Sequence, residues 1–102
     1  MKLISVAKLK HFWSLYPDSE QQLKAWADEV KKAQWQSPND IKALYKSASI
    51  LKNRRVVFNI CGNKYRLVVA IAYQQQIIYI KFVGTHAQYD KIDVNTVNIE
   101  GH

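Results

Sequence analysis

The spacing of hydrophobic residues divides the chain into a helical first half and a strand-rich second half. Between residues 6 and 46, apolar side chains recur every three or four positions, which is the period of an amphipathic helix. After residue 50 they alternate with polar side chains, which is the period of a strand with one buried face. The pattern predicts an α+β fold with N-terminal helices packed on one face of a twisted antiparallel sheet.

Three helices are predicted in the first half. The first ends before Pro17, which cannot continue a helix. The second begins after the N-cap candidates Asp18-Ser19-Glu20. The third begins after Ser37, with Pro38 in its first turn and Asp40 placed for a capping box. Their predicted apolar faces contain Val6, Leu9, Trp13, Tyr16, Leu23, Trp26, Ala27, Val30, Ala33, Ile41, Leu44 and Tyr45.

Two hairpins are predicted in the second half, and a short strand is predicted within residues 1–5. The first hairpin turns at Gly62-Asn63, since both residues accept positive φ. The pairs that it predicts are Ile60 with Tyr65, Asn59 with Arg66 and Phe58 with Leu67. The second turns at Gln75-Gln76. Its predicted pairs are Tyr73 with Ile78, Ile71 with Ile80, Val69 with Phe82 and Arg66 with Thr85.

This register predicts one apolar face, which would pack on the helices, and one open face of mixed character. The open face would hold Arg55, Val57, Asn59, Lys64, Arg66, Val68, Tyr79, Lys81 and Val83. Asn59, Arg66, Thr85 and His86 would converge at one end of it, with Lys64 and Lys81 on the same side. Cations and amides on an open sheet face suit the RNA backbone, although a solvated face would have a similar composition.

Composition predicts a single soluble domain spanning residues 1–102, with helices in about 6–46 and the sheet in about 50–102. No apolar run is long enough to span a membrane, so a cytoplasmic location without membrane contact is expected. The net charge of +7 favours a polyanionic partner. With Cys61 as the single cysteine, no intrachain disulfide or cysteine-rich zinc site can form.

Two segments resemble one family of bacterial toxins. They are Phe58-Asn59-Ile60-Cys61-Gly62-Asn63-Lys64-Tyr65-Arg66-Leu67-Val68, and Thr85-His86 followed by Tyr89-Asp90-Lys91. In combination they resemble the HigB family, which belongs to the wider RelE-like group of messenger RNA interferases. The resemblance covers the whole chain. It implies a RelE-like fold, a HigA-type helix-turn-helix antitoxin as partner, and cleavage of messenger RNA on the translating ribosome without cofactor or metal.

The resemblance also implies roles for individual residues. Arg66 matches the strand arginine that RelE-like enzymes use at the scissile phosphate, where its fixed cation would stabilise the phosphorane. His86 and Tyr89 match positions of general acid or base groups, and Lys91 is a further candidate for proton transfer or orientation. Unlike relatives with a strand glutamate as base, this chain has no acid on the predicted open face. The residues expected to contact RNA are Lys52, Arg54, Arg55, Asn59, Asn63, Lys64, Lys81, Thr85 and Asp90.

Two alternative functions fit the same residues. A non-catalytic module that binds RNA or the ribosome would use the basic face for phosphate contacts alone. A metal-dependent hydrolase would need His86, Asp90 and Asp93 as ligands, which is a sparse set for such a site.

Overall fold

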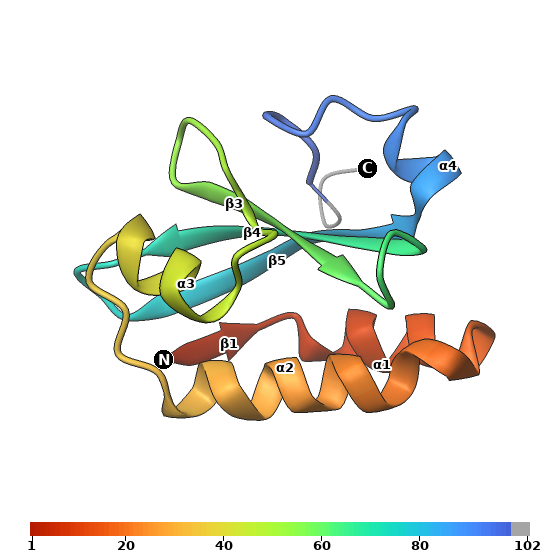
Figure 1. Ribbon diagram of the computed structural model, residues 1–102, viewed down its shortest axis with the longest axis horizontal. Helices are drawn as coiled ribbons and strands as arrows, with labels where there is room; N and C mark the ends of the chain where they lie inside the picture. Colours follow the sequence, from red (N-terminus) through yellow and green to blue (C-terminus); the bar gives the residue numbers. More distant parts are fainter. Residues whose placement is uncertain (99–102) are drawn as a thin grey trace.

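A computed structural model describes residues 1–98, and its elements form two helices beneath a five-stranded sheet with a third helix at one side (Figure 1). The last four residues of the predicted domain lie outside this range. In chain order the elements are β1 (Lys2–Ile4), α1 (Val6–Leu15), a 3-10 turn η1 (Pro17–Ser19), α2 (Glu20–Lys32), α3 (Pro38–Leu44), β2 (Ser49–Ile50), β3 (Arg55–Ile60), β4 (Tyr65–Ala72), β5 (Ile77–Thr85) and α4 (His86–Tyr89).

The three predicted helices are present, but their predicted caps differ from those observed. The side chains of Ser19 and Ser37 make no capping hydrogen bond. Ser19 Oγ instead donates to the carbonyl of Tyr16 over 2.7 Å. Asp40 Oδ2 accepts from the backbone N–H of Gln36 at 2.8 Å, and therefore closes the turn one residue before the predicted cap.

The α+β fold class is confirmed, and the sheet is mixed, with strand order β1-β5-β4-β3-β2. The predicted N-terminal strand is present, but β1 runs parallel to β5, whereas a fully antiparallel sheet was expected. The α-amino group of Met1 donates to the carbonyls of Val30, Lys31 and Ala33 at 2.9–3.1 Å. These bonds satisfy carbonyls at the end of α2, and they hold β1 against that helix.

The first hairpin has the predicted register. Ile60, Asn59 and Phe58 pair with Tyr65, Arg66 and Leu67, in that order. The turn also lies at Gly62-Asn63 as predicted, because the N–H of Lys64 donates to the carbonyl of Cys61 over 3.2 Å. The positive φ angles fall at Cys61 and Gly62, at 54° and 67°, and not at Asn63. The alternation of buried residues on both strands specifies this register.

The predicted register of the second hairpin is wrong. Val69 pairs with Ile80, and Val68 pairs with Phe82, so the ladder is irregular between Val68 and Val69. Lys81 is the additional residue on β5 and has no cross-strand partner in this ladder. The bulge reverses the facing of the residues that follow it, which is why Phe82 lies on the face opposite the helices.

The helices bury the first face of the sheet. The ring centroids of Trp26 and Phe58 lie 5.4 Å apart, and Trp35 and Tyr45 also pack on Phe58. Trp26 and Trp35 are buried, while Trp13 is half-buried. This core holds α1, α2 and α3 against β3, β4 and β5.

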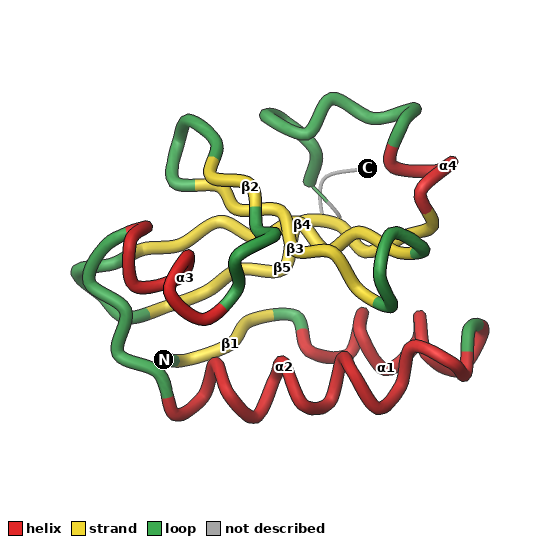
Figure 2. Tube along the Cα trace, in the orientation of Figure 1, coloured by secondary structure: helices red, strands yellow, loops and turns green. Residues whose placement is uncertain are grey.

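The second face is not the open surface that was predicted. Val57 and Val68, expected there as exposed residues, are 3% and 0% exposed. The chain after α4 returns across this face, on the side opposite α1 and α2 (Figure 2). Arg55 Nη1 donates to the carbonyls of Val94 and Val97, at 3.1 and 2.7 Å, and thereby anchors the returning segment. Here we call residues 90–98 the C-terminal segment.

Candidate active site

Arg66 lies on β4, on the face of the sheet that the C-terminal segment crosses. Its cross-strand neighbours are Asn59 on β3 and Gly84 on β5. Its Nη1 donates to the carbonyl of Asn63 over 3.1 Å, which directs the guanidinium toward the β3–β4 turn. The side chain is half-buried, so the remaining guanidinium donors can meet an anion at this end of the sheet.

The short helix α4 brings the predicted C-terminal residues to Arg66. Arg66 Cζ lies 5.7 Å from the centroid of the Tyr89 ring, a cation–π distance. The backbone N–H of His86 donates to the carbonyl of Lys64 over 3.0 Å, so the start of α4 is bonded directly to the start of the β4 region. The predicted convergence of Arg66 with this segment is therefore present, and its direct contact is with Tyr89.

Thr85 caps α4 instead of facing Arg66. Its cross-strand partner is Tyr65, whereas Arg66 lies opposite Gly84, so the predicted Arg66–Thr85 pair is wrong. Thr85 Oγ1 accepts from the backbone N–H of Gln88 at 3.1 Å, and Gln88 Oε1 accepts from the N–H of Thr85 at 2.9 Å. This reciprocal capping box starts the helix on which His86 and Tyr89 stand.

His86 has a carboxylate partner in the same helix turn. Its Nδ1 lies 3.1 Å from Asp90 Oδ2, and the two side chains are 51% and 59% exposed. A carboxylate beside Nδ1 favours a proton on that nitrogen, which leaves Nε2 as a proton acceptor. Lys91 follows directly and is exposed. The pair gives the site a group with the chemistry of a general base, on a surface that a substrate can reach.

Gly84 is the cross-strand neighbour of Arg66, and Phe82 and Gln88 lie beside this glycine; the sequence pattern did not identify any of the three as part of the site. A Cβ atom on Gly84 would lie 2.5 Å from Phe82 Cζ and 2.7 Å from Gln88 Oε1. The ring of Phe82 and the capping amide therefore occupy the space beside this glycine. Two sequence signals could have identified them, namely the Thr-x-x-Gln spacing of a capping box and a glycine inside a strand.

Lys64 was expected on the open face, but it belongs to a polar cluster on the helical side. Its Nζ donates to Asp18 Oδ2 of η1, and Tyr65 Oη donates to Asp18 Oδ1 over 2.6 Å. The hydrogen bond from Lys64, followed by that from Tyr65, lowers the pKa of Asp18 below its usual value. The same carboxylate raises the pKa values of Lys64 and Tyr65. The cluster joins η1 to the hairpin that carries Arg66.

Other predicted basic residues lie away from Arg66. Lys52 and Arg54 are exposed in the β2–β3 connection, and the carbonyl of Arg54 accepts from the N–H of Ile71 at the far end of β4. Arg55 binds the C-terminal segment as described above. Lys81 stands at the bulge, with its Nζ 5.5 Å from the centroid of the Tyr79 ring. The predicted RNA-binding residues are thus spread along the sheet. Those that lie near Arg66 or α4 are Asn59, Asn63, Thr85 and Asp90.

Within residues 1–98, the structure has no group of three or more His, Cys, Asp or Glu side chains close enough to hold one metal ion. His86 and Asp90 are adjacent, but Asp93 does not complete a triad with them. Over the same residues, no helix combines the length and apolar character needed to cross a bilayer.

Sequence comparison finds related proteins over most of the chain. The sequence profile described as HigB_toxin, RelE-like toxic component of a toxin-antitoxin system, matches residues 19–92. A protein of Escherichia coli strain K12 named mRNA interferase toxin HigB is 33% identical over 92 residues, covering 88% of each chain. The chain belongs to the HigB toxin family.

Further relatives agree with this assignment. The mRNA interferase HigB of Shigella flexneri has the same identity and coverage, and that of Escherichia coli O6:H1 is 23% identical over 94 residues, covering 90% of this chain and 91% of its own. The region matched to the HigB profile includes Arg66, His86, Tyr89 and Lys91, and it ends at residue 92. As a toxin of a toxin–antitoxin system, a HigB-family protein has an antitoxin as partner.

Proposed function

We propose that this chain is an endoribonuclease that cuts messenger RNA through 2′-hydroxyl attack, with Arg66 at the scissile phosphate. The observation that carries the proposal is the contact between Arg66 and Tyr89, because it joins the strand cation to the helix that bears His86. The relatives named mRNA interferase support the same substrate class. The proposed location is the cytoplasm, where messenger RNA is translated.

Cleavage without a metal needs three events at one phosphate. The 2′-hydroxyl loses a proton, the oxygen attacks phosphorus, and the 5′-oxygen leaves with a proton. The products are a cyclic phosphate and a 5′-hydroxyl, and the number of protons is conserved overall. Arg66 supplies a charged, planar donor for the phosphorane oxygens, which carry additional negative charge in the transition state.

His86 is the proposed proton carrier. Asp90 Oδ2 lies beside Nδ1, so Nε2 can accept the 2′-hydroxyl proton. Tyr89 and Lys91 are proposed to orient the substrate or to donate a proton to the leaving oxygen. The strand glutamate used as base by some relatives is not needed in this scheme, because the His86–Asp90 pair supplies the acceptor.

RNA binding is proposed to extend from Arg66 over Asn59, Asn63 and Thr85, with Lys52, Arg54 and Lys81 adding long-range attraction for the polyanion. The ribosome is the proposed place of cleavage, and a HigA-type helix-turn-helix protein is the proposed antitoxin.

Mapping of messenger RNA 5′ ends after induced expression tests the proposal. New 5′-hydroxyl ends are expected with the wild-type chain and not with Arg66→Ala. Blocking translation separates the two parts of the proposal, since cuts that persist would refute the requirement for the ribosome alone. Binding to RNA without any cut in either condition would identify a non-catalytic module and overturn the proposed activity.

A further inference from the structure

The indole N–H of Trp26 is buried without a hydrogen-bond partner among the described residues. Trp26 is 2% exposed, and its Nε1 is the one buried side-chain nitrogen or oxygen that lacks a partner in residues 1–98. Buried tryptophans usually pair this strong donor. An unpaired donor beside a hollow is therefore a feature that a bound acceptor would satisfy.

The hollow next to Trp26 is a slot between α2 and the edge of β3. It has a volume of about 150 Å³ and is lined by Gln22, Ala25, Trp26, Glu29, Tyr45, Phe58, Asn59 and Ile60. At one end Gln22 Oε1 accepts from the N–H of Cys61 at 2.6 Å. At the other end Tyr45 Oη donates to Glu29. Hydrogen bonds thus fix both ends of the slot, and Trp26 lies between them on α2.

The wall of the slot formed by β3 is a strand edge that lacks a partner strand in the described part of the chain. The two residues of β2 pair with Val56 and Val57, so the ladder stops before Phe58. The edge over Phe58–Ile60 has backbone groups available for a further strand. Extended peptides bind such edges by adding a strand, with side chains placed in neighbouring pockets.

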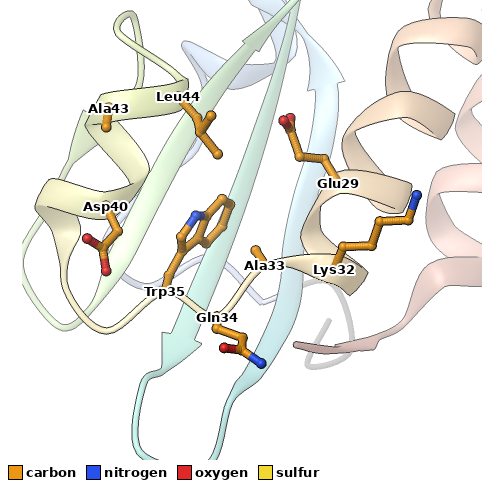
Figure 3. Close-up of a pocket in the computed structure, with 8 residues that line it drawn as sticks. All are labelled: Glu29, Lys32, Ala33, Gln34, Trp35, Asp40, Ala43 and Leu44. Carbon is orange, nitrogen blue, oxygen red and sulfur yellow. The ribbon is translucent and has the colours of Figure 1, made fainter.

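A second, larger hollow continues from the slot on the other side of Glu29. Its volume is about 670 Å³, and its floor is the ring of Trp35, which lies between side chains of α3 and of the end of α2 (Figure 3). Leu44 of α3 borders it and is 56% exposed. Ala33 and Ala43 extend the apolar lining.

The charges around the two hollows differ from those of the whole protein. Glu29 and Asp40 line them together with a single cation, Lys32, whereas the chain as a whole carries +7. Two carboxylates beside one ammonium make this lining less attractive to RNA phosphates than the basic remainder of the chain, and they suit a polypeptide with apolar and basic side chains. Arg66 and Tyr89 lie on the other face of the sheet, so the hollows are separate from the proposed catalytic groups.

We propose that the two hollows form the docking site of the antitoxin, an inference that rests on the proposed function. An extended antitoxin segment adds a strand to the edge at Phe58–Ile60, and one of its carbonyls accepts from Trp26 Nε1. An apolar side chain of the segment packs on Leu44 and Trp35, with a basic side chain near Glu29. Asn59 lines the slot and is the cross-strand neighbour of Arg66, so docking contacts the strand next to the catalytic arginine.

The test uses the full chain and the product of the open reading frame adjacent to its gene, with affinity measured by calorimetry. Leu44→Arg is expected to weaken binding by at least about 30-fold, as for a central contact of an interface. Leu15→Arg is the matched control, because Leu15 is 62% exposed on α1 and far from both hollows in sequence and fold. Equal binding of Leu44→Arg and the wild type would overturn the docking site.

A second measurement follows the indole N–H of Trp26 by NMR, with Trp26→Phe used for assignment. Addition of the same partner is expected to shift this resonance and to slow its hydrogen exchange. An unchanged resonance would overturn the proposal, and a shift on addition of RNA alone would make the slot an RNA site instead.

A wild-type chain that neither cuts RNA nor binds the partner refutes the proposed function. A chain that does both while Leu44→Arg still binds refutes only the docking site.

Discussion

The guanidinium of Arg66 lies 5.7 Å from the centre of the Tyr89 ring, although the two residues come from a strand and a helix that are separated by β5 in the sequence. The contact depends on the capping box that starts α4 and on the bond from the His86 N–H to the Lys64 carbonyl. The proposed catalytic groups are thus placed by backbone geometry as well as by their own side chains.

Substitutions of Arg66 and Tyr89 test the cation and the tyrosine hydroxyl separately. Arg66→Ala is expected to lower RNA cleavage by about 10²–10³-fold, because a fixed donor to the phosphorane is lost. Tyr89→Phe retains the ring beneath the cation, so its effect reports the hydroxyl alone and is expected to be smaller. Cleavage of a short RNA under single-turnover conditions measures both. Lys10→Ala, an exposed cation on α1, is the control and should cut at the wild-type rate.

His86→Ala is expected to lower the same rate by roughly 10²–10⁴-fold, the usual effect of losing a general acid or base. Asp90→Asn should cause a smaller loss, because it removes the group that holds Nδ1 while the imidazole remains. His11→Ala, on the exposed side of α1, provides a histidine control. Wild-type cleavage by His86→Ala would remove His86 from the mechanism.

Gly84→Ala and Gly62→Ala form a matched pair of glycine substitutions. At Gly84 the new methyl group meets Phe82 and the capping amide of Gln88, so overpacking should reduce the free energy of unfolding by about 1–3 kcal/mol. At Gly62 nothing lies within 4 Å, and the cost arises from a φ of +67°, about 1–2 kcal/mol. Urea denaturation measures both.

Activity separates the two substitutions. Gly84→Ala should also impair RNA cleavage, since Gly84 lies opposite Arg66 and its neighbour Gln88 caps α4. Gly62→Ala should leave the cleavage rate of the folded protein near that of the wild type. Equal activity of the two variants at equal stability would show that the surroundings of Gly84 do not affect catalysis.

The Asp18 cluster predicts a pH dependence of stability. The pKa of Asp18 is below its ordinary value of 3.8 in the folded chain, because Lys64 and Tyr65 donate to its carboxylate. A group with a depressed pKa stabilises the fold above its unfolded pKa, and this contribution is lost as the pH falls through the folded value. The Tm of Asp18→Asn should therefore lie below that of the wild type at neutral pH, with the difference shrinking below pH 3.8.

Asp28→Asn, an exposed acid on α2, is the control for this measurement. Its Tm difference from the wild type should show no comparable change at acid pH. A difference for Asp18→Asn that stays constant down to pH 2 would contradict the role assigned to the cluster.

Arg55→Lys distinguishes anchoring from electrostatic attraction. The substitution keeps the charge but loses the two bonds to Val94 and Val97, so amide exchange of Thr96 and Val97 should be faster by about tenfold. If Arg55 acts on RNA through charge alone, Arg55→Lys should bind RNA as the wild type does. The exchange rates of the Thr96 and Val97 amides should then equal those of the wild type. Hydrogen exchange measured by NMR and RNA binding at several salt concentrations test the two roles.

The sequence predicts some of these relationships well, for identifiable reasons. The Asn59–Arg66 pair follows from strict alternation on both sides of a short turn at Gly62-Asn63, and both the pair and the turn are correct. The second register fails first at the turn, because Ala72 pairs with Ile77 around a loop of four residues where a two-residue turn was predicted. A bulge at Lys81 then changes the pairing again, and neither Val68 nor Val69 signals it in the sequence. A shift of this kind reverses which face every later residue occupies.

Longer-range contacts could not be predicted from local pattern. Val57 and Val68 are buried on the face that the C-terminal segment crosses (Figure 2). This segment has no regular hydrophobic spacing, and it is anchored by an arginine that the sequence assigns to RNA. The pairing of Lys64 with Asp18 joins residues from different halves of the chain. Charge patterns identify such residues as exposed, but they do not specify which opposite charge they meet.

The parallel pairing of β1 with β5 has a consequence for biosynthesis. The first strand pairs with the last one, so completing the sheet closes a loop that contains all the other strands. A chain emerging from the ribosome can form α1 and α2 early, yet it cannot complete the sheet until β5 and α4 are free. We expect the toxin to acquire its active fold only after nearly all of its sequence has been translated.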